Sequence, residues 1–299
     1  MSKSPLAKGL IALLRLPYWL MTGGLALLTA FAINKGNFGS LQAVPLIFFS
    51  MACITSAGFA INDYFDKESD AVIKPKRPLP SGTLSFKQVI GISAFLFALG
   101  LVLALCINWL SLVIISVDSA LLLIYSATVK RKSGFVANVL VGILTGTAFL
   151  FGEAAISSPP NLTLISLSLY PIAFGTIGGN ILRDILSLEG DSKVGYPTLP
   201  QKIGNINSVK VAAVFFVVCG VLAPLPYLIG GFTIFYLPLI LLWSALLVYS
   251  SIRLVLSASA VENVKKLERL ITMSMILLPL SLANVFVTGT ILLLIRGLG

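Results

Sequence analysis

The chain has 299 residues, of which 57% are hydrophobic and only 11% are charged, and its mean hydropathy is +1.00. Soluble domains carry roughly 25% charged residues, so this composition excludes an ordinary soluble protein and indicates one integral to a membrane. The net charge is +10 and no residue is histidine, which excludes histidine general-base chemistry and imidazole metal ligands.

Apolar segments long enough to cross a bilayer recur along the whole chain. About 20 mostly apolar residues suffice for one helical crossing. We expect a single all-α membrane domain over residues 1–299, with nine spans at about 10–33, 42–62, 86–107, 109–129, 135–155, 163–186, 207–229, 233–255 and 270–295. Nine crossings leave the two chain ends on opposite sides of the membrane.

The basic residues indicate how the spans are oriented. Of the 21 Lys and Arg residues, 19 fall on one side of this arrangement, and only Lys35 and Arg296 fall on the other. Because cytoplasmic loops are enriched in Lys and Arg, we expect a multi-pass protein of the cell membrane, with a cytoplasmic N-terminus and an external C-terminus. Contact with anionic membrane lipid would explain the same basic rim. Nothing indicates a nucleic-acid ligand or an obligate protein partner.

Two long cytoplasmic connections, at about 63–85 and 187–206, lie beside dense groups of carboxylates. Seven of the eleven acidic residues fall in NDYFDKESD and NILRDILSLEGD: Asp63, Asp66, Glu68, Asp70, Asp184, Glu189 and Asp191. Acids this dense in an apolar chain repel one another unless a cation lies between them. Mg²⁺ is the expected cation because it binds carboxylate oxygens and phosphate. The alternative is a set of helix caps and solvated loop charges.

Helical spacing brings the first acidic cluster onto one face. Asn62, Asp66 and Asp70 lie four residues apart, so their side chains can converge on a common metal ion. Asp63 lies about 100° away around the helix and is expected to be a cap or a supporting residue.

The second cluster offers a matching set of ligands if its helix persists. Asp184 and Asp191 are seven residues apart and would then share one face, with Ser187 between them. The offset of 118 residues from Asn62 to Asn180 suggests two related halves around a central cavity. The expected metal ligands are thus Asn62, Asp66, Asp70, Asp184 and Asp191.

Three motifs resemble those of the UbiA superfamily of intramembrane prenyltransferases. NDYFDKESD followed by KPKRPLPSG resembles its first signature, and LEGDSKVGYPTLP is similar to its second. IYSATVKRKSGFVANVLVG is similar to the segment between its fourth and fifth spans. The resemblance implies a nine-helix bundle around a cavity in which Mg²⁺ joins aspartates to the diphosphate of a polyprenyl donor.

The resemblance also implies roles for residues around the clusters. Cations that bind the departing diphosphate more tightly than the intact donor would lower the barrier, and the candidates are Arg15, Lys74, Arg77 and Lys130. Topology explains Lys74 and Arg77 equally well, and snorkelling explains Arg15. Tyr125 and Tyr196 could position or stabilise an allylic cation, or serve as packing residues. Asn138 and Asn180 complete the expected substrate contacts.

Asp118 is a further candidate, in the middle of the predicted span 109–129. A carboxylate is costly at that depth, so Asp118 is expected to mark a polar cavity or an acceptor contact. The expected catalytic residues are therefore Asp66, Asp70, Asp118, Tyr125, Lys130, Asp184 and Asp191.

The acceptor is the open part of the prediction. Many relatives have aspartate at the position of Ser187 and Asn at the position of Tyr18, which leaves the second metal site and the acceptor specificity less defined. The KPKRPLPSG segment looks most like the archaeal ether-lipid branch, that of the digeranylgeranylglyceryl phosphate synthases, which implies transfer of geranylgeranyl to geranylgeranylglyceryl phosphate. Aromatic quinone precursors and chlorophyllide-type acceptors are alternatives. A cation-coupled transporter is the alternative from another functional class.

Overall fold

A computed structural model describes residues 5–34, 41–257 and 260–297. Within these ranges the regular secondary structure is entirely helical. Among the described residues, nine helical segments are long and apolar enough to cross a membrane: Leu6–Ile33, Ala43–Phe65, Phe86–Ile107, Trp109–Lys132, Gly134–Ile156, Leu164–Leu186, Leu199–Leu228, Ile234–Leu256 and Val261–Ile291. The expected all-α membrane bundle is confirmed for the described residues. Lys35, expected on the external side, lies outside them.

The first five spans and the short helices that join them make up the N-terminal part. Its elements are α1 (Pro5–Leu14), α2 (Pro17–Ile33), α3 (Ala43–Phe65), α4 (Lys67–Ile73), α5 (Phe86–Ile107), α6 (Trp109–Ile124), the π-helix Tyr125–Val129, α7 (Lys130–Lys132) and α8 (Gly134–Ile156). Polar caps fix where three of these helices begin. Ser85 and Gln88 form a capping box at α5, and Asn108 and Ser133 accept backbone hydrogen bonds at α6 and α8.

The last four spans make up the C-terminal part. Its elements are α9 (Leu164–Leu169), the 3₁₀ turn Tyr170–Ala173, α10 (Phe174–Leu186), α11 (Leu188–Lys193), α12 (Leu199–Leu222), α13 (Leu225–Leu228), the 3₁₀ turn Ile234–Tyr236, α14 (Leu237–Leu256), α15 (Val261–Ser274) and α16 (Leu277–Gly297). Its core is built around the fully buried side chains of Phe216, Tyr236 and Trp243, and Phe149 of α8 belongs to the same cluster.

Several predicted boundaries were wrong because helices continue or break where hydropathy gives no signal. The first span is divided at Arg15, whose φ is 50°. The seventh begins at Leu199 rather than 207 and is kinked at Gly204, whose φ of 78° favours glycine. The ninth begins at Val261 rather than 270, because α15 starts in a polar stretch, VENVKKLER. The connections expected at 63–85 and 187–206 contain α4 and α11.

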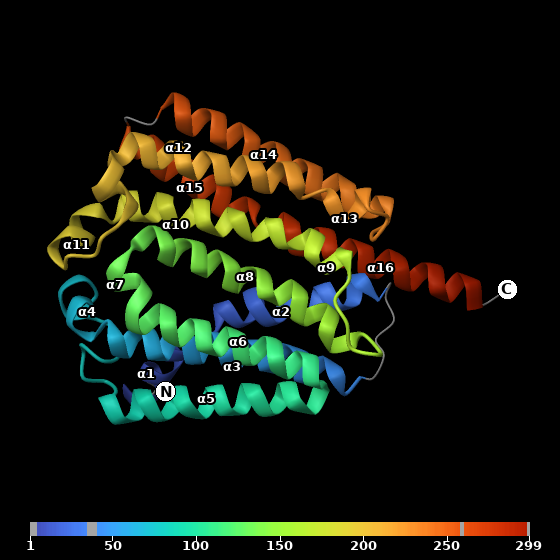
Figure 1. Ribbon diagram of the computed structural model, residues 1–299, viewed down its shortest axis with the longest axis horizontal. Coiled ribbons are helices and arrows are strands. Elements are labelled where there is room, and N and C mark those ends of the chain that lie inside the picture. Colours follow the sequence, from blue (N-terminus) through green and yellow to red (C-terminus); the bar gives the residue numbers. More distant parts are fainter. Residues whose placement is uncertain (1–4, 35–40, 258–259, 298–299) are drawn as a thin grey trace.

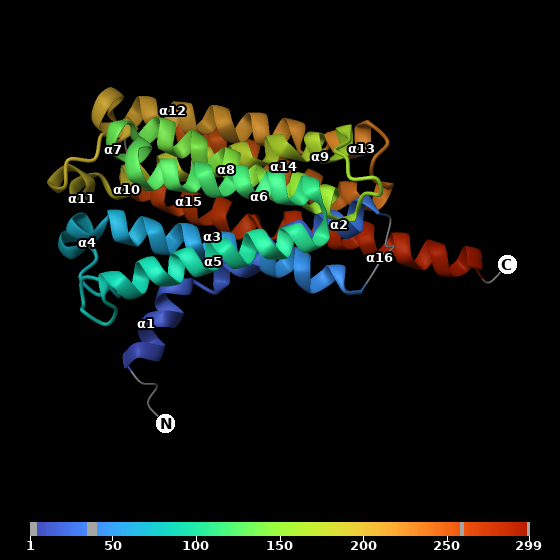
Figure 2. The same cartoon turned by 60° about the horizontal axis from the view of Figure 1, so that its bottom comes forward.

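The helices run roughly side by side, and the short helices gather at their ends (Figure 1). α4, α7 and α11 lie together at one end of the bundle, and the C-terminal end of α16 extends beyond the opposite end. α1 projects from the bundle at an angle, and the break at Arg15 separates it from α2 (Figure 2). Both acidic clusters therefore lie at one end of the molecule, as the alternation of spans requires.

Candidate active site

The two acidic segments are built alike. α3 ends at Phe65 and α4 begins at Lys67, and the residue between them, Asp66, has φ −86° and ψ 5°. α10 ends at Leu186 and α11 begins at Leu188, and Ser187 between them has φ −104° and ψ 5°. Each acidic segment is thus a membrane helix followed, after one non-helical residue, by a short helix.

This common break corrects the register of the two halves. The equivalent residues Asp66 and Ser187 are 121 positions apart, so the expected offset of 118 was wrong by one helical turn. In the corrected register Asp70 corresponds to Asp191, and Asn62 corresponds to Arg183. The first prediction failed because it aligned two asparagines, whereas the backbone aligns the two helix breaks.

Ion pairs neutralise the first acidic cluster. Asp63 accepts from Arg15 Nη2 at 2.7 Å and from Arg77 Nη1 at 2.9 Å. Arg77 also pairs with Asp70, and Lys130 pairs with Asp66. These three aspartates are buried, so the cations offset a desolvation cost that each carboxylate would otherwise carry. Asp63, expected only as a cap or supporting residue, joins two arginines at the centre of the network.

Asp66 is the most fully hydrogen-bonded carboxylate of the first cluster. Its Oδ2 accepts from Asn62 Nδ2 at 2.8 Å as well as from Lys130, and its Oδ1 accepts from the Tyr196 hydroxyl at 2.7 Å. The Asn62 Oδ1 atom is buried and has no hydrogen-bond partner in the described part of the chain. Asn62 therefore presents a free oxygen ligand next to Asp66.

The second cluster is more open and carries fewer cations. Asp184 Oδ2 accepts from Asn138 Nδ2 at 2.8 Å, and Asp191 Oδ2 accepts from the Ser187 hydroxyl at 2.5 Å. Because α10 ends at Leu186, the continuous helix that would put Asp184 and Asp191 on one face is interrupted. Across the described ranges, no group of three acidic or cysteine side chains is close enough to hold a metal ion by itself.

A cavity of about 390 Å³ runs between α2, α3, α6, α8 and α10. Its polar lining includes eight charged, amide or phenolic side chains besides Tyr18, and seven of the eight were predicted for the site: Arg15, Asn62, Asp118, Tyr125, Asn138, Asn180, Arg183 and Asp184. Other walls are apolar and include Met21, Met51, Ile54, Leu122, Val141 and Leu144. The cavity thus joins the acidic clusters to an apolar interior, an arrangement suited to a molecule with an anionic head and a hydrocarbon tail.

Asp118, predicted to mark a polar cavity or an acceptor contact, lines this cavity. It is 3% exposed, and its Oδ2 accepts from Thr147 Oγ1 at 2.8 Å. Its Oδ1 is buried without a hydrogen-bond partner among the described residues. An unsatisfied buried oxygen is costly, so its retention beside a cavity indicates a polar ligand.

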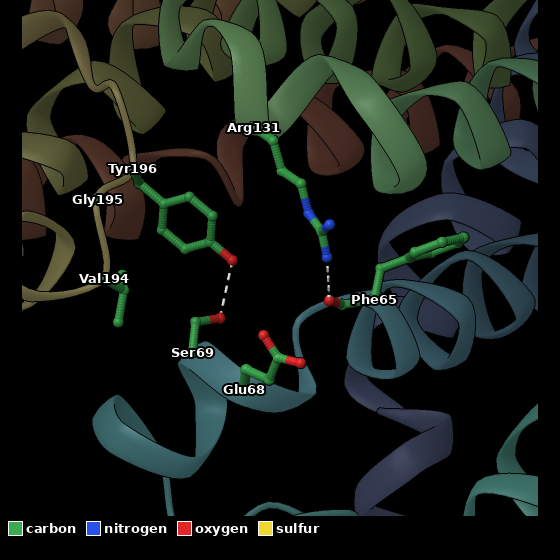
Figure 3. A pocket seen from close by; sticks show the side chains of 7 residues that line it. All are labelled: Phe65, Glu68, Ser69, Arg131, Val194, Gly195 and Tyr196. Atoms are coloured by element: carbon green, nitrogen blue, oxygen red, sulfur yellow. Dashed lines mark hydrogen bonds between the residues drawn. The ribbon is translucent and has the colours of Figure 1, made fainter.

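A second pocket, also about 390 Å³, lies at the same end of the bundle between α4, α7 and the loop after α11 (Figure 3). Its lining consists of Phe65, Glu68, Ser69, Arg131, Val194, Gly195 and Tyr196. The Tyr196 and Ser69 hydroxyls are 2.8 Å apart, and Arg131 donates to the Phe65 carbonyl at 2.7 Å. The loop of the C-terminal half is thereby attached to α4 and to Asp66.

Two predicted residues outside the spans have shifted acidity. Burial, reinforced by nearby Asp66, raises the pKa of Tyr196, so its hydroxyl keeps its proton and can donate to that carboxylate. Loss of hydration and then the charge of Arg77 lower the pKa of Lys74. The nearby charge of Asp70 opposes this shift only in part.

Two residues that lie at the candidate site, Ser69 and Arg183, were not predicted as site residues from the sequence. Ser69 was not singled out, although its place between Asp66 and Asp70 was a signal. Arg183 was assigned to topology alone, yet it lines the cavity next to Asp184. The corrected register, with Arg183 at the position of Asn62, would have identified it as a cavity residue.

Comparisons with known proteins agree with this geometry. Residues 24–294 match the UbiA prenyltransferase family. The digeranylgeranylglyceryl phosphate synthase of Natronomonas pharaonis is 37% identical over 230 residues, which cover 77% of this chain and 81% of that protein.

Solved structures show the same fold. One, described as giving structural and mechanistic insights into the biosynthesis of digeranylgeranylglyceryl phosphate synthase in membranes, has a TM-score of 0.79 and 29% identity, covering 94% of this chain and 99% of its own. A UbiA homologue from Archaeoglobus fulgidus, solved with GPP and Mg²⁺, has a TM-score of 0.68 and 20% identity, covering 94% and 99%. On the strength of the match over most of its length, the chain belongs to the UbiA prenyltransferase family.

Proposed function

We propose that the protein transfers a geranylgeranyl group from its diphosphate to geranylgeranylglyceryl phosphate, in a reaction that depends on Mg²⁺. The observation that carries the proposal is the junction of a cation-rich acidic cluster with a largely apolar cavity. The name of the Natronomonas pharaonis relative supports the choice of acceptor. Membership of a prenyltransferase family removes the reason to consider a transporter.

The first cluster fits Mg²⁺ by the chemistry of its donors. Asn62 Oδ1 is buried without a partner beside Asp66, and both supply the hard oxygen ligands that Mg²⁺ prefers. Asn62, Asp66 and Asp70 would hold the ion on one side, with Asp184 and Asp191 on the other. When bound, Mg²⁺ would neutralise the negative charge that builds up on the leaving diphosphate. The Archaeoglobus fulgidus relative solved with GPP and Mg²⁺ supports this assignment.

The basic residues bind the donor's diphosphate. Lys130 and Arg77 now neutralise Asp66 and Asp70, and they are close enough to the cluster to transfer part of their hydrogen bonding to diphosphate oxygens. An added anion would also stabilise the charged form of Lys74, whose pKa is lowered by loss of hydration and by the charge of Arg77. These interactions strengthen as the carbon–oxygen bond breaks, so they lower the barrier as well as binding the substrate.

The cavity protects the reacting carbon from water. Its apolar walls accept the isoprenoid chain, and Tyr125 contributes an aromatic ring to the lining. The Lys130 Nζ atom lies 4.8 Å from the centre of the Tyr196 ring, so that ring already interacts with a cation. The acceptor hydroxyl oxygen forms the new bond to carbon, a carboxylate on the cavity takes its proton, and the bonding electrons of the old bond depart with diphosphate.

We also propose that the reaction takes place at the cytoplasmic face, with the N-terminus on that side and the C-terminus outside. The distribution of 19 of the 21 basic residues supports this orientation. Cysteine labelling from either side of sealed membranes tests it. A cysteine introduced at Lys67 should react only from the cytoplasm, and exclusive external labelling would reverse the assignment.

A panel of acceptors tests the proposed substrate. Purified protein with Mg²⁺ and geranylgeranyl diphosphate should prenylate geranylgeranylglyceryl phosphate and should leave 4-hydroxybenzoate and chlorophyllide unmodified. Preferential prenylation of either aromatic compound or tetrapyrrole would instead assign the protein to the quinone or chlorophyll type of acceptor.

A further inference from the structure

The cations around the cavity fall into two groups. Arg15, Arg77 and Lys130 each pair with a carboxylate of the first cluster, and their side chains are only 20–25% exposed. Arg183 lies on α10, in the C-terminal half, and its side chain is 54% exposed. It lines the same cavity through the position that corresponds to Asn62 in the other half. The second half therefore offers a cation where the first half offers an amide.

Arg183 is held by one ion pair, with Glu268, and by one neutral hydrogen bond, with Asn180. Its Nε donates to Glu268 Oε1 and its Nη1 donates to Asn180 Oδ1, both at 3.2 Å, the long end of the hydrogen-bond range. Its Nη2 has no partner among the residues that the structure describes. Glu268 also accepts from Thr272 Oγ1 at 3.1 Å, so it keeps a partner if Arg183 turns away. The guanidinium is available for a planar, two-point contact with a phosphate.

The proposed reaction requires two separate anion sites. The diphosphate of the donor occupies the cations of the first cluster, so the phosphate of the acceptor needs a cation elsewhere on the cavity. Its lipid chain lies in the membrane, which keeps the phosphate at the end of the bundle where Arg183 lies. We propose that Arg183 binds the phosphate of the acceptor and selects a phosphorylated glycerol ether over an uncharged alcohol. This inference rests on the proposed function.

The test compares two acceptors that differ only in the phosphate: geranylgeranylglyceryl phosphate and geranylgeranylglycerol. In Arg183→Gln the ratio of kcat/KM for the phosphorylated acceptor to that for the alcohol should fall by about 10- to 100-fold, the usual effect of a lost charged hydrogen bond. Arg183→Lys should restore part of the ratio. Arg253→Gln, which removes an exposed arginine from the end of α14 away from the cavity, is the matched control.

An unchanged ratio in Arg183→Gln, or an equal fall in Arg253→Gln, would overturn the assignment. Equilibrium binding of geranylgeranylglyceryl phosphate to the intact protein separates this inference from the proposed function. If the wild type binds this acceptor without transferring a prenyl group to it, the proposed function fails, and binding at least 10-fold weaker in Arg183→Gln still supports the phosphate site. Equal binding by the wild type and Arg183→Gln refutes the site, whatever the turnover.

Discussion

The Tyr196 hydroxyl, on the loop after α11, donates a 2.7 Å hydrogen bond to Oδ1 of Asp66 between α3 and α4. It also lies 2.8 Å from the Ser69 hydroxyl. One tyrosine thus joins the acidic segment of the N-terminal half to the loop of the C-terminal half. Gly195, with a φ of 71°, provides the turn that precedes it. This contact fixes Asp66 in position while Lys130 neutralises it from the other side.

Tyr196→Phe removes the donor and leaves the ring. We expect kcat/KM for the prenyl diphosphate to fall about 10-fold, because a buried carboxylate loses a hydrogen bond. Steady-state kinetics with a labelled donor checks this. Tyr249→Phe, at a 52% exposed tyrosine of α14, is the matched control. Identical kinetics in Tyr196→Phe and the wild type would show that the bond does not serve catalysis.

The lowered pKa of Lys74 gives a pH dependence. Lysine carries its charge below its pKa, so affinity for the donor's diphosphate should decline as the pH rises through a value below the ordinary 10.5. Lys74→Arg should move this alkaline decline to higher pH, because a guanidinium stays charged. Titration calorimetry of a non-reactive diphosphate analogue measures the profile. Lys87→Arg, at an exposed lysine of α5, should leave the pH of this decline unchanged. If Lys74→Arg and the wild type lose affinity over the same pH range, Lys74 does not bind the diphosphate.

We expect Asp118 to lower the stability of the protein and to increase its activity. Asp118→Leu removes a buried carboxylate that has an unsatisfied oxygen, and Thr147 keeps a 2.6 Å bond to the Leu144 carbonyl. We expect a gain of about 1–3 kcal/mol in the free energy of unfolding, seen as a higher Tm in detergent. Prenyl transfer should fall, because a polar contact in the cavity is lost. Lower stability together with full activity would show that Asp118 is structural.

Close packing of α8 against α2 depends on Gly152. A Cβ atom there would lie 2.4 Å from the Ala26 carbonyl oxygen, so Gly152→Ala forces the helices apart. We expect the free energy of unfolding to fall by about 1–3 kcal/mol, which is detected as a lower Tm. Gly24→Ala on α2 is the control, because nothing lies within 4 Å of its added methyl group. Equal Tm values for the two variants would refute this account of the packing.

Hydropathy predicted the nine spans because each must present apolar side chains to lipid. Helix breaks were not predicted, since Arg15, Asp66 and Ser187 change the backbone without changing the mean hydropathy of their segments. The break at Ser187 mattered most. It changed the register of the two halves and placed Asp184 and Asp191 on two different helices, α10 and α11.

Helical spacing identified the acidic residues of the first cluster but not their partners. The pairing of Arg77 with Asp63 and Asp70 depends on the path of the chain after α4, which no local pattern fixes. The contact of Tyr196 with Asp66 spans 130 residues and arises only when the two halves pack together. Long-range contacts of this kind require the three-dimensional structure.

The most direct test of the central claim measures product formation and diphosphate release in the same reaction. Wild-type protein with geranylgeranyl diphosphate and geranylgeranylglyceryl phosphate should form the doubly prenylated product and diphosphate in equal amounts with Mg²⁺, and neither with EDTA. Asp66→Asn should lose about 100-fold or more in kcat, while Glu68→Gln, at an exposed neighbour, should not. Equal product formation with EDTA, or by Asp66→Asn, would contradict Mg²⁺-dependent prenyl transfer at this cluster.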